Sequence, residues 1–175
     1  LTNPSVLVST QSARDLSELS DDSVDYVFTD PPYSWKVQYG EANFVWEAWL
    51  GFDADWRSDE IIVNEVRGQS EERWFELMLE SVRECYRVLK PGRWLSLCYH
   101  DTAEGTWELI QDMMDVVGVV PDAVDDTTGI DAGQKSQKQH VADRALKRDL
   151  VVSFRKPYPG ERPVRVRVAF APGDT

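Results

Sequence analysis

The residues best suited to chemistry form one tetrapeptide, Asp30-Pro31-Pro32-Tyr33. Its two prolines lack backbone N–H groups and stiffen the turn, so carbonyl oxygens are presented beside a carboxylate and an aromatic ring. A pocket with only acceptors and a stacking face suits an amino group attached to a planar ring. The Asp30 carboxylate and the Pro31 carbonyl can each accept one N–H, while Tyr33 stacks on the ring. Accepting both hydrogens directs the nitrogen lone pair out of the ring's π system.

The elements that must position this tetrapeptide follow from hydrophobic periodicity. Residues 24–29 are β-branched or aromatic and run into the prolines, which predicts a strand with Asp30 at its carboxyl end. The most regular helical pattern covers residues 71–90 and stops at Pro91-Gly92. The same criteria predict further strands at residues 6–9, 94–99, 119–124 and 150–154, and further helices at residues 13–19, around 45–52 and at about 103–117.

Strands that alternate with long helices predict an α/β protein with a mainly parallel, Rossmann-like sheet and helices on both faces. Ligands of such sheets collect at the carboxyl ends of the strands, where Asp30 is expected. The 175 residues suffice for one domain and are too few for two of ordinary size. We expect this domain to cover residues 1–156. Residues 157–175 are predicted to form a hairpin or edge-strand extension, because residues 164–168 alternate valine with arginine.

The composition describes a globular chain, with 42% apolar and 29% charged residues and seven tryptophans. The sequence has no apolar run of about 18 residues and no visible export signal, so no membrane association is expected. Cys85 and Cys98 are far apart and match no metal spacing. They are interpreted as buried, reduced thiols of a cytoplasmic protein without a metal site.

The charge is unevenly distributed. A net charge of −12 ordinarily argues against nucleic acid as a partner. However, residues 1–134 hold 27 acidic and 9 basic residues, whereas residues 135–175 hold 4 acidic and 10 basic residues. Aspartate exceeds glutamate and arginine exceeds lysine, a balance that resembles the acidic surfaces of proteins from salt-loving organisms. The overall acidity is therefore interpreted as an adaptation to habitat.

The tetrapeptide and its flanks resemble a known family. Asp30-Pro31-Pro32-Tyr33 looks like the catalytic motif of amino-methyltransferases that use S-adenosylmethionine, and residues 23–29 are similar to the fourth strand of these enzymes. The resemblance is strongest to the large multidomain adenine-specific DNA methylases and covers roughly residues 5–120, and more loosely 149–156. The further segments that carry it are Val37-Gln38-Tyr39-Gly40-Glu41, residues 44–50, Arg87-Val88-Leu89-Lys90-Pro91-Gly92 and residues 94–100.

This resemblance implies a class I methyltransferase sheet and methylation of adenine N6 in double-stranded DNA, with the base flipped out of the helix, as in restriction-modification systems. It assigns catalysis to Asp30, Pro31, Pro32 and Tyr33, and a cofactor contact to Asp30. The alternatives are methylation of rRNA bases, of cytosine N4 or of protein glutamine. A further alternative, from a different class, is a catalytically inactive module that only binds nucleic acid or partner subunits.

One departure from the family concerns the cofactor. These enzymes hold S-adenosylmethionine with a glycine-rich turn after their first strand, whereas the first glycine here is Gly40. The expectation is that the cofactor-binding half lies upstream, in a longer polypeptide of which this chain is the catalytic half. The chain alone is then expected to be inactive.

Other candidate site residues follow the motif or lie near the C-terminus. Trp35 and Tyr39, with Tyr33, are candidates for substrate binding, and the aromatic residues up to Trp56 form either a base-stacking platform or core and lid packing. His100 is interpreted as a surface or capping residue. Lys135, Lys138 and Arg144, together with His140, Lys147 and Arg148, form either a phosphate-contacting segment or a solvated helix face.

Overall fold

The computed structural model describes residues 6–32, 34, 37–53, 55–99, 104–121, 128–131 and 148–163. In this part of the chain a five-stranded sheet has the order β1-β2-β5-β3, with β4 also paired to β5. The strands are β1 (Val24–Thr29), β2 (Leu89–Tyr99), β3 (Val120–Pro121), β4 (Thr128–Asp131) and β5 (Arg148–Arg155).

The sheet is mixed. β1 is parallel to β2, whereas β5 is antiparallel to β2, β3 and β4. Because β1 and β2 run the same way, their carboxyl ends lie at the same edge of the sheet. The predicted α/β class is confirmed, but the prediction of a mainly parallel sheet is wrong for the described strands, because β1 and β2 are their one parallel pair.

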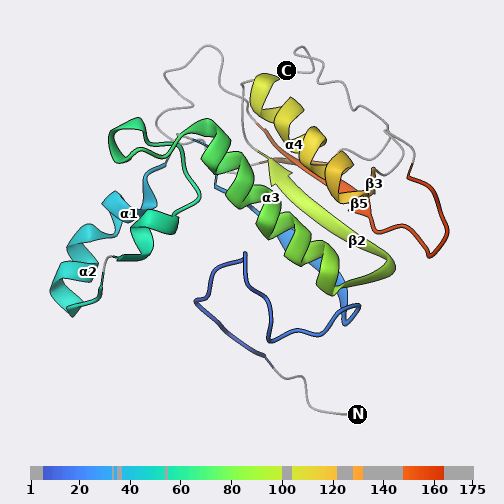
Figure 1. The fold of residues 1–175 in the computed structure, drawn as a ribbon, viewed down its shortest axis with the longest axis horizontal. Helices are drawn as coiled ribbons and strands as arrows, with labels where there is room; N and C mark the ends of the chain where they lie inside the picture. The colour runs from blue at the N-terminus through green and yellow to red at the C-terminus, as the bar shows by residue number, and fades with distance from the viewer. Residues whose placement is uncertain are drawn as a thin grey trace.

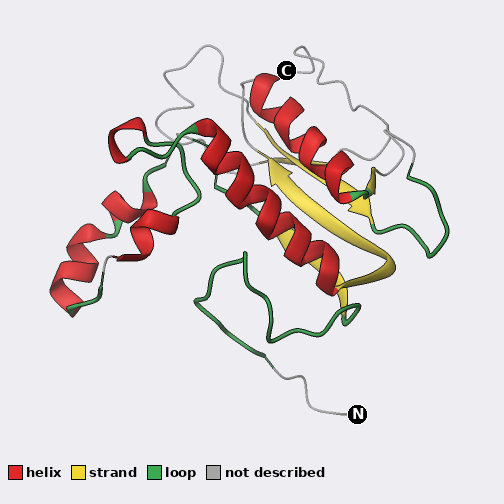
Figure 2. Cartoon of the chain, viewed as in Figure 1, coloured by secondary structure: helices red, strands yellow, loops and turns green. Residues whose placement is uncertain are grey.

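Two long helices, α3 (Glu71–Val88) and α4 (Glu104–Val117), pack against one face of this sheet (Figures 1 and 2). α3 begins where the Ser70 side chain accepts a hydrogen bond from the backbone N–H of Arg73, an N-cap that satisfies one of the open donors of the first turn. The helices and strands share one apolar core. Its buried members include Trp74 and Met78 of α3, Met113 of α4, Leu97 of β2 and Phe154 of β5.

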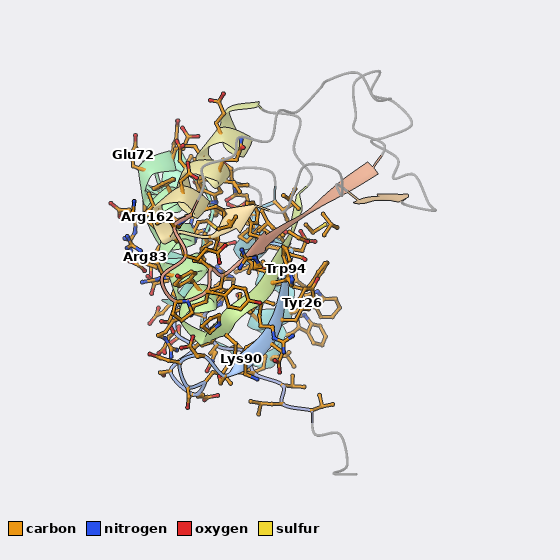
Figure 3. All side chains as sticks on the ribbon, turned by 90° about the vertical axis from the view of Figure 1, so that its right-hand side faces the viewer. Tyr26, Glu72, Arg83, Lys90, Trp94 and Arg162 are labelled. Atoms are coloured by element: carbon orange, nitrogen blue, oxygen red, sulfur yellow. The ribbon has the colours of Figure 1, made fainter. Side chains whose placement is uncertain are left out.

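The opposite face of the sheet presents aromatic side chains. Tyr26 pairs with Trp94 and Phe28 with Ser96, so these side chains lie on the face away from α3. Figure 3 shows Tyr26 and Trp94 on this side, with Glu72 and Arg83 of α3 on the other. Tyr26 and Phe28 are 54% and 56% exposed. Helices were expected on both faces, and both long helices that the structure describes cover the same one.

Between β1 and α3 the chain forms short helices. They are α1 (Tyr39–Ala42), α2 (Phe44–Leu50), η1 (Asp55–Asp59) and η2 (Glu65–Arg67). Figure 1 shows α1 and α2 to one side of the molecule, away from the sheet. The predicted helix around residues 45–52 corresponds to α2.

The predicted strand at residues 6–9 and helix at 13–19 are wrong. Residues 6–10 pair with no described strand, and the segment up to residue 20 forms turns. A seven-residue helix is marginal without tertiary support, and here α3 binds the backbone of the segment instead. Arg87 donates to the carbonyls of Leu16 and Leu19, both at 2.9 Å, and Glu84 accepts from the Leu16 N–H at 3.0 Å.

The predicted boundary between α3 and β2 is also wrong. The helix ends at Val88, and Pro91-Gly92 lies inside β2. A bulge accommodates it, because Val24 pairs with Leu89 but Tyr26 pairs with Trp94. Gly92 has φ +77° and donates its N–H to the Lys156 carbonyl at 2.8 Å. The other long elements lie close to their predicted positions, whereas α1, η1, η2 and β4 were not predicted.

Several other expectations concern the remaining residues. Residues 164–168 lie outside the described part, so the extension after residue 156 stays a prediction. Cys85 and Cys98 are present as thiols, and burial raises the pKa of Cys85 to about 11. None of the described helices is long and apolar enough to cross a membrane.

Candidate functional site

Asp30 lies where the sequence predicts it, at the carboxyl end of β1. The preceding residue, Thr29, pairs with Leu97, and β2 continues to Tyr99 at the same edge of the sheet. The Asp30 side chain is exposed, whereas Pro31 is buried and Pro32 half-buried. The prolines end the strand because they cannot donate to the ladder. The carboxylate is thus held at the edge where ligands of such sheets bind.

The turn after the prolines is unusual at Ser34. This residue is 5% exposed and has φ 47°, a conformation that residues other than glycine adopt rarely. Its N–H donates to the Pro32 carbonyl at 3.2 Å, and its own carbonyl accepts from the Val63 N–H at 3.0 Å. A non-glycine residue persists in such a conformation only where its surroundings hold it. The segment around Val63 therefore supports the turn after Asp30-Pro31-Pro32.

The same segment also binds Gln38. The Gln38 side chain donates through Nε2 to the Val63 carbonyl at 3.2 Å, and accepts through Oε1 from Asn64 Nδ2 at 2.8 Å. Residues 34 and 38 thus both bind the loop around 63–64. These two attachments hold Ser34 and Gln38 against residues 63–64.

Glu60 is the buried acid at the centre of this support. Its side chain is 6% exposed, accepts from the Gly40 N–H at 2.8 Å and pairs with Arg67 Nη1 at 2.9 Å. The Gln69 side chain donates to the Glu60 carbonyl at 3.1 Å. These contacts bind α1 to η2. Sequence analysis missed Glu60, because an acidic residue between a polar and an apolar residue is usually taken for a surface residue. The turn-forming residues Asn64 and Gly68 were the only sequence signal of an ordered turn near Glu60.

The structure describes only some of the other predicted site residues. Tyr33, Trp35, Lys135, Lys138 and Arg144 lie outside the described residues, as do His100, His140 and Lys147. Tyr39 begins α1 and is 43% exposed. Arg148 begins β5, opposite Asp131.

Core packing of the aromatic residues after the motif is not observed in the described part. Trp46, Trp49 and Phe52 are 69%, 86% and 65% exposed. Trp46 and Trp49 do lie on a helix, as their spacing predicts, but the helix does not bury them in a core. These side chains form an exposed apolar surface on and beside α2.

The described residues match one part of the site expected for S-adenosylmethionine. Asp30 is at the strand end, but Gly40 lies in α1 with its N–H bound to Glu60, so it does not form a cofactor-binding turn. A Cβ at Gly40 would lie 2.7 Å from Glu60 Oε2, which explains the glycine by close packing instead. At the other end of β1, Lys90 pairs with Asp25 at 3.0 Å and lowers the pKa of that carboxyl.

No protein-family model matches the sequence, and no curated protein is significantly similar to it. Several solved structures do align. A proposed DNA modification methylase from Thermus thermophilus has a TM-score of 0.47 and 19% identity, over 89% of this chain and 56% of that one. Its complex with S-adenosyl-L-methionine has a TM-score of 0.46 and 19% identity, over 88% and 56%. The PvuII DNA methyltransferase, specific for cytosine N4, has a TM-score of 0.47 and 12% identity, over 81% and 46%. This chain thus spans about half the length of the structures it matches.

Proposed function

We propose that this chain carries the catalytic half of an S-adenosylmethionine-dependent DNA methyltransferase that modifies adenine N6. The observation that supports the proposal is the place of Asp30-Pro31-Pro32, at the carboxyl end of β1 beside the parallel strand β2. The exposed carboxylate next to a buried proline provides the acceptor edge that an amino group needs. The motif resembles the catalytic motif of amino-methyltransferases, and the strand position gives it a ligand-facing location.

In this mechanism the chain prepares the amino group. The Asp30 carboxylate and the Pro31 carbonyl accept its two hydrogens, which turns the nitrogen lone pair away from the ring. Tyr33 stacks on the flipped base and holds its plane. When bound, S-adenosylmethionine supplies an electrophilic methyl group. No thiol nucleophile is required, because the amino group itself is the nucleophile.

The cofactor fits this site in part. Asp30 would contact its methyl-bearing end, but the described residues include no glycine-rich turn that could admit its methionine and ribose groups. The proposal therefore requires further cofactor-binding residues, which we assign to a longer polypeptide. Cytosine N4 presents the same pair of hydrogens on a planar ring, so the choice of adenine rests on the resemblance of the flanking segments alone.

The test is methylation of double-stranded DNA by the full-length protein, followed by mass analysis of the nucleosides. We expect N6-methyladenine, and we expect Asp30→Ala to lower the rate by a factor on the order of 10²–10³ without unfolding the protein, because Asp30 is exposed. Asp25→Ala is the matched control at the other end of β1. Detection of N4-methylcytosine would show that the target base is cytosine and not adenine. Activity of Asp30→Ala within a few-fold of wild type would refute the catalytic assignment. DNA binding with no methylated product would indicate the inactive binding module.

A further inference from the structure

Helix α2 exposes its apolar side chains and turns its charged side chain toward the protein, the reverse of an ordinary surface helix. None of its residues, Phe44 to Leu50, is buried. Trp46 and Trp49 are 69% and 86% exposed, whereas the side chain of its acid, Glu47, is only 12% exposed. A surface helix normally turns its apolar stripe inward and its charges outward. In α2 the charge faces the protein and the tryptophans face away.

Side-chain contacts hold α2 in this orientation. Glu47 accepts from Trp56 Nε1 at 2.9 Å and pairs with Arg57 Nη2 at 2.5 Å. The Arg57 guanidinium lies over the Phe44 ring, 5.5 Å from its centroid. The helix closes at Gly51 in the left-handed conformation. The outward aromatic face is therefore preorganised, which lowers the entropic cost of binding a partner.

The exposed apolar side chains on and beside this helix are close together in sequence and more than half exposed. We call them the α2 surface; they are Phe44, Val45, Trp46, Trp49, Leu50 and Phe52. Apolar residues scattered singly on a surface need no explanation, but a cluster of large ones marks a binding site. Tryptophan in particular is enriched among the residues that dominate protein–protein affinity.

The charges around the α2 surface indicate which partner it fits. The described residues between 37 and 69 include seven acids and two arginines, and the two arginines are already paired with Glu47 and Glu60. Glu41, Asp53 and Asp55 are exposed beside α2. DNA phosphates would be repelled by this rim. A second copy of the chain would bring the same acids against themselves.

We infer that the α2 surface is a docking site for a protein segment that presents large apolar side chains flanked by lysine or arginine. The apolar residues of that segment would cover the tryptophans, and its cations would face the acidic rim. Such an interaction is independent of the proposed methyl transfer. It assigns a binding role to an aromatic segment that neither the core nor the Asp30 turn uses.

The test uses the full chain and two synthetic amphipathic helical peptides. Both carry leucine and tryptophan at helical spacing, one flanked by lysine and the other by glutamate at the same positions. We expect the lysine peptide to bind at least about tenfold more tightly than the glutamate peptide in calorimetry. Trp49→Ser should weaken binding of the lysine peptide by about tenfold or more. Because Trp49 is 86% exposed, its replacement should leave the circular dichroism spectrum unchanged.

The matched control is Val66→Ser, which removes a 99% exposed apolar side chain from η2 and should leave peptide affinity unchanged. Equal binding of the two peptides, no measurable binding of either, or an equal loss in Val66→Ser and Trp49→Ser would overturn the inference. Duplex DNA binding that Trp49→Ser abolishes would overturn it in favour of nucleic acid. Self-association in sedimentation that the same variant abolishes would overturn it in favour of a second copy.

Discussion

Replacing Glu60 by alanine should detach α1 from its support and loosen the loop that follows Asp30. Glu60 is 7% exposed and binds two groups through its carboxylate, the Gly40 N–H and the Arg67 guanidinium. Once the carboxylate is gone, the Gly40 N–H loses its acceptor, whereas the Arg67 guanidinium keeps its contact with the Arg57 carbonyl. The effect should therefore be local to the part of the chain between Ser34 and η2.

The magnitude follows from the two interactions that are lost. A buried N–H left without an acceptor costs about 1–3 kcal/mol. Breaking a fully buried ion pair costs about 3–5 kcal/mol, but the Arg67 side chain is 24% exposed and water recovers part of that loss. We expect a destabilisation of about 2–4 kcal/mol, a large share of the ~5–15 kcal/mol that holds an ordinary domain together. Glu60→Gln keeps an acceptor for Gly40 and should cost about 1–2 kcal/mol.

The assay combines denaturant unfolding with hydrogen exchange followed by mass spectrometry. Glu60→Ala should speed exchange in residues 38–47 and leave α3 and β2 close to wild type, because local opening needs less free energy than global unfolding. Glu65→Ala, an exposed acid in η2, is the matched control and should change neither measurement. Unchanged exchange at Gly40 in Glu60→Ala, or equal effects of the two variants, would refute the reasoning.

Two further predictions concern β2 and α3. Gly92→Ala should destabilise the protein by about 2 kcal/mol or more, because φ is +77° and the new Cβ would lie 2.4 Å from the Tyr158 ring; Tyr158→Ser in the same chain should recover part of the loss in thermal unfolding. Hydrogen bonds from Arg87 and from the Leu16 N–H lower the pKa of Glu84 from 4.5 to about 2. The stability from this ionised carboxyl is complete above about pH 4.5 and is lost as the pH falls toward 2, so Glu84→Gln should flatten the stability profile across that window.

Matched controls separate these effects from general damage. Gly160 has φ +86° with nothing within 4 Å of a Cβ, so Gly160→Ala carries the backbone strain without the clash and should cost less than Gly92→Ala. Glu76, whose side chain is 63% exposed and pairs with Arg73, is the control for Glu84, and Glu76→Gln should leave the acid limb of the stability profile in place. Equal costs in the two glycine variants, or equal pH profiles in the two glutamine variants, would contradict these assignments.

Elements with a strong local pattern could be predicted from the sequence. The β-branched run before Pro31 becomes β1, and the long amphipathic pattern becomes α3 (Glu71–Val88). The two prolines are enough to place Asp30 at a strand end. Such features depend on hydrophobic periodicity and backbone donors, which neighbouring residues already specify.

Long-range contacts set which way polar and apolar groups face. Periodicity identified α2 as a helix but could not show that Trp49 faces outward, because orientation depends on the Glu47 contact with Arg57, ten residues away. Residues 13–19 have a helical pattern, yet Arg87 of α3 binds their carbonyls and holds turns instead.

Lys156 is a charged residue whose burial could not be predicted from the local sequence. It is 9% exposed and donates to the carbonyls of Tyr86 and Leu89 and to the Asp22 carboxylate. No local pattern marks a lysine for burial, because burial becomes favourable only when distant acceptors replace its lost hydration. The sequence therefore specified where most strands and helices form, and the long-range partners of a few side chains specified how the turn after Asp30 and the α2 surface are held.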